Sequence, residues 1–188
     1  PLADEALARA QELDKSDKRR RGPLHGLPFS LKECFQLQGT DATAGLGKFK
    51  SQNGVVDHTP THNAPLVDAL LDAGAVPLAK TNVPQLMYSF ECENPIYGRT
   101  SAPSSEDFIP GGSSGGEAAL IASGGSVVGI GTDIGGSCRT PAHMSGCCGI
   151  KPARNRLSGI RKSPSLVHGA QTALASVPGV LGRHADDI

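Results

Sequence analysis

Two glycine-rich segments constrain what this chain can fold into more than any other feature. The first is PGGSSGGEAALI (residues 110–121) and the second is GTDIGGSCRTP (residues 131–141). In each, a serine follows two glycines, so the backbone beside its hydroxyl can adopt conformations closed to other residues and can approach a ligand closely. Composition alone would favour a flexible linker. The flanks argue against one, because residues 117–121 resemble a helix start and residues 127–130 a strand.

Helical and extended patterns alternate along the rest of the chain. Apolar residues recur at helical spacing over residues 4–14, and a second helix is expected to begin at Pro65 and to end before Gly74. Short apolar segments at 27–32 and 75–79, bounded by turn residues, are typical of strands. This alternation predicts a layered α/β fold, and the lack of an internal repeat favours a single domain.

The charge and hydropathy of the chain exclude several kinds of partner. Its 18 basic and 18 acidic residues give a formal net charge of zero, so there is no basic field to bind a phosphate backbone. No stretch approaches the roughly 18 consecutive apolar residues of a membrane helix. We therefore expect no nucleic-acid partner and no membrane span in this chain. Its expected location is the cytoplasm or the periphery of an intracellular membrane.

The five cysteines indicate reduced thiols. Their number is odd and no C-x-x-C pair occurs, which favours an intracellular protein without disulfide bonds. A zinc site at the neighbours Cys147 and Cys148 is the alternative, but paired metal-binding thiols normally have about two to four residues between them. We expect both to be small buried residues, and we expect no metal site.

Several further motifs accompany the glycine-rich segments. They are GPLHGLPFSLKE (22–33), AKTNVPQ (79–85), ENPIYG (93–98) and GIKP (149–152). In this order they resemble the amidase signature family of serine hydrolases, which cleave carbon–nitrogen bonds of amides. The resemblance implies an α/β fold with a mixed β-sheet core flanked by helices. It spans residues 1–188 as one domain but only an N-terminal portion of the family's catalytic core, so we expect an incomplete fold, truncated at the C-terminus and at the N-terminus.

The family uses a Lys-Ser-Ser triad, and the resemblance assigns its roles to Lys32, Ser113 and Ser137. Ser137 would be the nucleophile, and Ser113, on a cis peptide bond after Gly112, would relay a proton between Ser137 and Lys32. Lys32 can act as a base only when neutral, which requires its pKa to fall by roughly 3 units from about 10.4. Burial lowers a lysine pKa, and Glu33 would point to the opposite side of the strand.

The residues around Ser137 suit the stabilisation of an oxyanion. Small residues before it would let successive backbone N–H groups converge on a developing negative charge. These groups would come from Ile134, Gly135, Gly136 and Ser137. Three polar residues are expected to support the site, namely Ser114, Asp133 and Arg139, the last two as an ion pair that braces the turn.

The resemblance also bears on the substrate. Met87 and Tyr88 occupy positions that contribute to the acyl side of the family's substrate pocket, although core packing explains them equally well. The motifs are more similar to the fatty-acid amide hydrolase and fungal acetamidase branches than to the glutamine-transamidating subunit. This implies hydrolysis of linear fatty acyl or small aliphatic amides through an acyl-enzyme on Ser137. A small-molecule amide is the implied partner, no cofactor is implied, and a homodimer of the full-length protein is left open.

The sequence leaves alternative interpretations. Both serines of the first segment fit G-x-S-x-G, so an α/β-hydrolase-type serine esterase with Asp133 and either His143 or His168 competes, although the preceding residues make a poor strand. A nucleotide-binding module is less well supported, because neither the P-loop nor the dinucleotide fingerprint is complete. A non-catalytic subunit with the amidase fold is the third alternative, and the intact triad argues against it.

Overall fold

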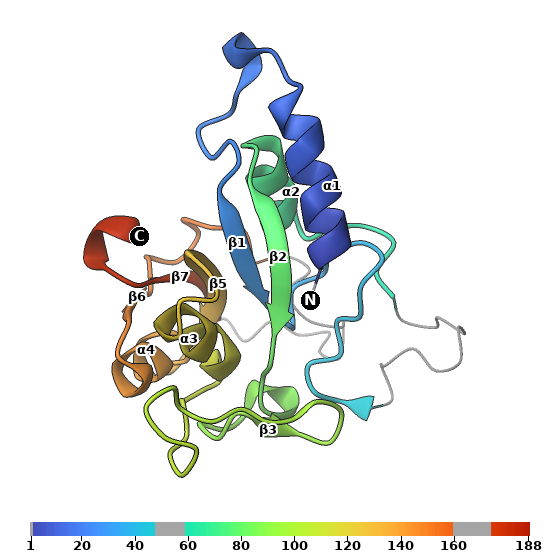
Figure 1. Cartoon of the computed structure of the whole chain (residues 1–188). Coiled ribbons are helices and arrows are strands. Elements are labelled where there is room, and N and C mark those ends of the chain that lie inside the picture. Colours follow the sequence, from blue (N-terminus) through green and yellow to red (C-terminus); the bar gives the residue numbers. More distant parts are fainter. Residues whose placement is uncertain (1, 48–58, 160–173) are drawn as a thin grey trace.

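A five-stranded β-sheet forms the centre of the computed structural model, which describes residues 2–47, 59–159 and 174–188 (Figure 1). The strands are β1 (Pro28–Lys32), β2 (Val76–Thr81), β5 (Val128–Asp133), β6 (Cys148–Ile150) and β7 (Val177–Gly182). Their order in the sheet is β2-β1-β5-β7-β6. β1 is parallel to β2 and β5, whereas β7 is antiparallel to β5 and β6. The mixed sheet that the resemblance implies is confirmed.

Helices flank the sheet. They are α1 (Ala3–Asp14), α2 (Pro65–Asp72), α3 (Gly115–Ala122) and α4 (Arg139–Ser145). Figure 1 shows α1 and α2 beside β1 and β2, and α3 and α4 near β5. Short elements complete the described chain, namely 3-10 turns at Lys18–Arg20, Gln85–Met87 and Ala185–Asp187 and a small ribbon of β3 (Glu93–Asn94) with β4 (Gly98–Arg99).

The central strand β1 presents different chemistry to its two faces. Successive side chains of a strand point to opposite faces of the sheet. Phe29 and Leu31 lie in the larger apolar cluster, which includes Val67 from α2. Ser30 and Lys32 point to the other face, where both are fully buried. Because Phe29 and Leu31 must face the apolar core, Ser30 and Lys32 must face the opposite side of β1, toward α3.

The glycines at the start of α3 allow this helix to lie against the chain segment after β2. A Cβ atom added at Gly116 would collide with the backbone nitrogen and oxygen of Asn82, and one added at Gly115 would collide with Cys92. The amide of Gly116 donates to the carbonyl of Asn82 at 3.2 Å. The first glycine-rich segment is thus a packed junction and not a linker.

The expected elements are present with small shifts at their ends. The helix expected over residues 4–14 is Ala3–Asp14, and the strands expected at 27–32 and 75–79 are β1 and β2. α4, β6 and β7 were not anticipated from the sequence. β7 contains Pro178 and Gly179, both of which are uncommon inside strands.

Three features are absent from the described residues. Among the described residues, no helix is both long and apolar enough to cross a membrane. No disulfide bond forms between the cysteines, and the described part of the chain holds no cluster of three or more His, Cys, Asp or Glu side chains that could bind a metal.

Candidate active site

Lys32 and Ser113 meet between β1 and the segment that precedes α3. Lys32 ends β1, and its Nζ lies 2.7 Å from Ser113 Oγ and 2.8 Å from Thr132 Oγ1 of β5. Lys32 has no exposed surface, and the two hydroxyl-bearing residues are also buried. Because β1 is an inner strand, between β2 and β5, the amine of Lys32 lies in the protein interior and not in solvent.

The surroundings of Lys32 favour its neutral form. Burial lowers the pKa of Lys32, and negative charges on the nearby cysteines or on Glu117 would act less strongly in the opposite direction. Within the described part of the chain, no carboxylate forms an ion pair with Lys32. Glu33 points away, as expected, and accepts hydrogen bonds from the amides of Thr43 and Ala44 at 2.5 and 2.8 Å. A lysine in this state can accept a proton.

Ser113 and Ser137 open onto one cavity. The peptide bond between Gly112 and Ser113 is cis, as the resemblance implies. Both serines line the cavity, but no hydrogen bond joins their hydroxyls among the described residues. The expected contact between them is therefore absent in this conformation. Ser137 is only half-buried and its hydroxyl turns about a single side-chain bond, so its position relative to Ser113 depends on one dihedral angle.

A buried carboxylate organises the turn that carries Ser137. Asp133 ends β5 and accepts hydrogen bonds from the amides of Gly136 at 2.9 Å and Cys138 at 3.1 Å. Arg139 adds two side-chain bonds, at 3.0 and 2.9 Å. Burial alone would raise the pKa of Asp133, but the bonds from Arg139 and from the backbone lower it to about 2. The expected ion pair is present, and it fixes the turn.

The same bonds correct the expected oxyanion site at one position. The amide of Gly136 donates to Asp133 and is therefore directed away from the cavity. Ile134 and Gly135 are exposed to the cavity, and Ser137 follows them along its wall. The amides of these three residues make no hydrogen bond within the described part of the chain. They are the remaining candidates for an oxyanion, whereas Gly136 supports the turn.

Ser114 connects the two glycine-rich segments. Its amide donates to the carbonyl of Ser137 at 3.0 Å. Its hydroxyl lies 3.3 Å from both the amide and the carbonyl of Thr132. The expected supporting residue thus ties the turn that carries Ser137 to the segment that carries Ser113.

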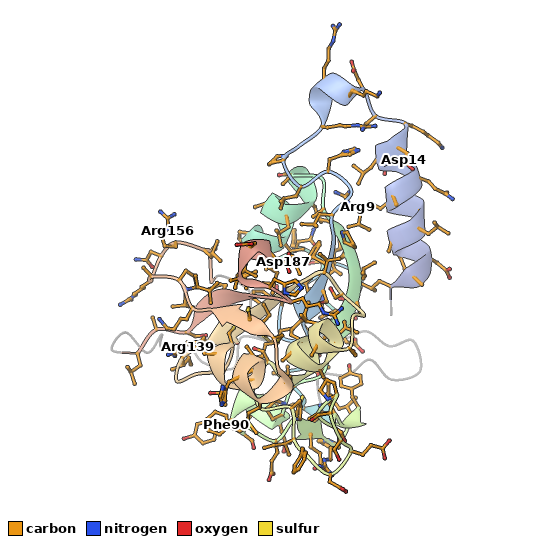
Figure 2. All side chains as sticks on the ribbon, turned by 60° about the vertical axis from the view of Figure 1, so that its left-hand side comes forward. Arg9, Asp14, Phe90, Arg139, Arg156 and Asp187 are labelled. Atoms are coloured by element: carbon orange, nitrogen blue, oxygen red, sulfur yellow. The ribbon has the colours of Figure 1, made fainter. Side chains whose placement is uncertain are left out.

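The cavity has a volume of about 480 Å³ and a largely apolar wall. Its lining residues are Leu86, Met87, Tyr88, Ser89, Phe90, Ser113, Thr132, Ile134, Gly135, Ser137 and Ser176. Met87 also packs against the larger apolar cluster, as core packing predicts, whereas its contact with a substrate stays a prediction. Tyr88 is 94% exposed and Phe90 is 53% exposed. Figure 2 shows Phe90 at the outer edge of the molecule.

Two residues of the site escaped the sequence analysis. Thr132 was not anticipated, although it directly precedes Asp133 on a predicted strand and could have been placed near Lys32 by pairing that strand with β1. Glu117 appeared to be an ordinary acid in the first turn of a helix, but it is fully buried. No signal in the sequence distinguished it.

The esterase interpretation has no support in the described residues. Residues 106–112 form no strand before the serines that fit G-x-S-x-G. His143 is exposed, and Asp133 is engaged by Arg139. His168 lies outside the described residues.

A mixed sheet that carries a buried Lys-Ser pair beside a glycine-rich turn is the arrangement expected of an amidase signature protein. The Amidase family matches residues 1–188, and the chain belongs to this family. Amidase 1 from Gibberella moniliformis is 44% identical over 183 residues, which cover 96% of this chain and 34% of that protein. Fatty-acid amide hydrolase 1 from Sus scrofa is 45% identical over 170 residues, which cover 89% of this chain and 28% of that protein.

The fold is also found among solved structures. One described as fatty acid amide hydrolase aligns with a TM-score of 0.88 at 35% identity, covering 98% of this chain and 32% of its own. This chain spans about a third of the length of the relatives that it matches. The similarity to a fatty-acid amide hydrolase, which the motifs implied, is confirmed.

Proposed function

We propose that the chain carries the nucleophile and the base of an amide hydrolase. Ser137 Oγ attacks the carbonyl carbon while its proton moves through Ser113 to the neutral amine of Lys32. The amides of Ile134, Gly135 and Ser137 donate to the oxyanion. Lys32 then returns the proton through Ser113 to the leaving nitrogen, the carbon–nitrogen bond breaks, and an acyl ester remains on Ser137.

Water completes the cycle in this proposal. It attacks the acyl ester, and its proton passes to Lys32 and back to Ser137 Oγ as the carboxylic acid leaves. The observation that carries the proposal is the hydrogen bond of 2.7 Å between buried Lys32 and Ser113, which opens onto the cavity that Ser137 also lines. A lysine of lowered pKa is therefore separated from the cavity only by the hydroxyl group of Ser113.

The lining of the cavity supports linear fatty acyl or small aliphatic amides as substrates. Leu86, Met87, Phe90 and Ile134 present apolar surface, and no Asp, Glu, Lys, Arg or His side chain lines the cavity among the described residues. An acyl chain gains about 0.8 kcal/mol for each CH₂ group that it buries on such a surface. The name of the similar pig protein, fatty-acid amide hydrolase, agrees with this class.

Labelling with a fluorophosphonate tests the proposal. Such a reagent reacts with an activated serine, so we expect one label, on Ser137, and no label on a Ser137→Ala variant. Ser89→Ala is the matched control, because Ser89 also lines the cavity and has no assigned role in the reaction. Intact mass and peptide mapping give the readout. A folded chain that is never labelled, or labelling that survives Ser137→Ala, would contradict the assignment.

A further inference from the structure

Glu117 is a buried carboxyl group to which the proposed reaction assigns no step. It lies in the first turn of α3, faces the sheet and has no exposed surface. Its Oε1 accepts from Thr81 Oγ1 at 2.5 Å, and its Oε2 lies 2.6 Å from Ser30 Oγ. Gly129 of β5 leaves room for it, because a Cβ atom there would collide with Oε2.

Counting hydrogens around Glu117 indicates its protonation state. Ser30 Oγ also lies 3.0 Å from Ser126 Oγ, which in turn lies 3.0 Å from the carbonyl of Val128. Three oxygen–oxygen contacts therefore lead from Glu117 to Val128, but the two serines supply only two hydrogens. If Glu117 were a carboxylate, one contact would have no hydrogen. If it is a carboxylic acid, each contact has one.

The acid form gives a consistent direction to the three contacts from Glu117 to Val128. Glu117 donates from Oε2 to Ser30, Ser30 donates to Ser126, and Ser126 donates to the carbonyl of Val128. Thr81 Oγ1 lies 3.3 Å from the carbonyl of Leu31, but its single hydrogen goes to the nearer Oε1 of Glu117, which accepts in either state. A buried carboxylic acid whose donor and acceptor atoms are all satisfied avoids the cost of an unsatisfied polar group.

The strands of the parallel half of the sheet bring no charge that pairs with Glu117. β1 brings Lys32, which forms no ion pair with Glu117 in the described part of the chain. β2 brings Lys80, whose amine donates instead to the carbonyl of Asp41. The side chain of Glu117 is therefore next to Lys32 without being bonded to it.

The other elements that pack on α3 also leave Glu117 without a compensating charge. β5 ends at Asp133, which is held by Arg139. β7, Val177–Gly182, carries no ionisable side chain. At the start of α4, burial raises the pKa of the Cys138 thiol to about 12, so this thiol is uncharged near neutral pH, and His143 is exposed on the outer surface.

The balance of physical effects agrees with the hydrogen count. Burial raises the pKa of Glu117, and the bonds from Ser30 and Thr81 and the nearby Lys32 lower it by less, so the result is about 7. A position near a helix N-terminus favours a carboxylate only weakly, so burial outweighs the helix.

We propose that Glu117 is a carboxylic acid that donates its proton to Ser30, and that it is a positioning residue which leaves Lys32 without a neighbouring negative charge. Ser30 lies on the same face of β1 as Lys32, and Thr81 is the partner of Lys32 in β2. A charge on Glu117 would therefore raise the pKa of Lys32. The first half of the proposal rests on the hydrogen bonds alone, and the second half rests on the proposed function.

Infrared spectroscopy tests the first half without any activity. We expect the band of a protonated carboxyl group to persist to a pH near 7, well above the ordinary glutamate pKa of about 4.3, and to vanish in Glu117→Gln. In Ser126→Ala, the hydrogen of Ser30 can turn to Glu117 and stabilise the carboxylate, so the band should disappear at lower pH. A folded wild-type chain without the Glu117 band at pH 6, or an unchanged midpoint in Ser126→Ala, would overturn the proposal.

The ratio of fluorophosphonate labelling rates at pH 6 and pH 9 tests the second half. Ser126→Ala should lower this ratio about fivefold or more if the pKa of Lys32 rises by about one unit. The double variant Ser126→Ala/Glu117→Gln should recover the wild-type ratio, because the charge is gone. A merely structural role would slow labelling equally at both pH values and leave the ratio unchanged.

The outcomes separate the two proposals. If Glu117→Gln alone raises labelling at pH 6 by tenfold or more, Glu117 was charged in the wild-type chain and the inference fails while the proposed function stands. If the wild-type chain is never labelled, the proposed function fails, and the infrared titration still decides the state of Glu117.

Discussion

At the scale of single residues, Lys32 is the side chain whose protonation state would decide whether the proposed hydrolysis can proceed. A fully buried ammonium ion without a paired carboxylate costs several kcal/mol, so the fold favours the amine. The fold does not need the charge, because a methionine would fill a similar volume. A substitution can therefore remove the amine of Lys32 while it keeps the packing around the side chain. This makes Lys32 a good position for a functional test.

We expect Lys32→Met to lower the rate of Ser137 labelling by about 10² to 10⁴-fold, the range usual for loss of a general base. The variant should remain folded, because burial of an apolar side chain replaces burial of an amine. Lys80→Met is the matched control, since Lys80 is a half-buried lysine of the neighbouring strand with a pKa also lowered, to about 8, but it lines a different cavity. Labelling rates and circular dichroism give the comparison. Equal rates in the two variants would exclude Lys32 as the base.

Asp133 makes the free energy of unfolding depend on pH. Its pKa is lowered to about 2 in the folded chain, against about 3.9 when unfolded. Its contribution is thus fully present above about pH 4 and is lost as the pH falls towards 2. We expect Asp133→Asn to reduce the free energy of unfolding by about 2 kcal/mol at pH 7 and to flatten its acid dependence. Denaturant unfolding at several pH values measures this.

The control for Asp133 is Asp72→Asn, which removes an exposed carboxyl group at the end of α2. It should change the free energy of unfolding by no more than about 0.5 kcal/mol. If both variants are equally stable at pH 7, the bonds to Asp133 do not stabilise the fold.

At the scale of elements, the approach of α3 to the segment after β2 sets the geometry of the site. α3 begins directly after Ser113 and Ser114, and Gly116 contacts the backbone of Asn82. A shift of this helix would move Ser113 away from Lys32. Gly116 is therefore required because it allows α3 to approach the backbone of Asn82 closely, and not because it is flexible.

Gly116→Ala tests this requirement. In an ordinary helix the change would stabilise by about 1 kcal/mol, but here the added Cβ meets backbone atoms. We expect a loss of about 1 to 3 kcal/mol in the free energy of unfolding, together with slower labelling of Ser137. Gly47→Ala is the control, because a Cβ there meets nothing within 4 Å. A stabilised Gly116→Ala variant would show that α3 can move without cost.

The elements also show what the sequence could predict. α1, α2, β1 and β2 follow from apolar spacing and from Pro and Gly at helix ends, because these signals are local. β7 could not be predicted in this way, since Pro178 and Gly179 argue locally against a strand. Both residues lie where β7 pairs with β5 alone, because β6 pairs only with residues 180–182. Strand pairing of this kind depends on contacts between distant segments.

The candidate site also contains some features that the sequence could predict and some that it could not. Lys32, Ser113 and Ser137 could be named from motifs, and the hydrogen bond from Lys32 to Ser113 agrees with them. The direction of the Gly136 amide and the burial of Glu117 could not be named. Both depend on which groups the folded backbone brings near, and neither leaves a pattern in neighbouring residues.

At the scale of the whole molecule, β5 joins two halves of the sheet. It is parallel to β1 on one side and antiparallel to β7 on the other. It ends at Asp133, where the turn that carries Ser137 begins. Ligands of α/β proteins often bind beyond the carboxyl ends of parallel strands, and the candidate site occupies that place relative to β1 and β5.

Hydrogen exchange should show this central role. We expect the amides of β1 and β5 to exchange at least tenfold more slowly than those of β3 and β4, because the latter form a two-stranded ribbon apart from the main sheet. Mass spectrometry of peptides that cover these strands gives the rates. Faster exchange in β5 than in β3 would contradict the arrangement.

Arg139 links the turn that carries Ser137 to the outer surface of the protein. Its side chain is 52% exposed, whereas its partner Asp133 has no exposed surface. Figure 2 shows Arg139 at the outer edge of the molecule. The ion pair that holds the Ser137 turn can thus be reached from bulk solvent by arginine-directed reagents such as dicarbonyls, which need not enter the cavity. We therefore expect the reactivity proposed for Ser137 to be open to chemical control from the outer surface of the protein.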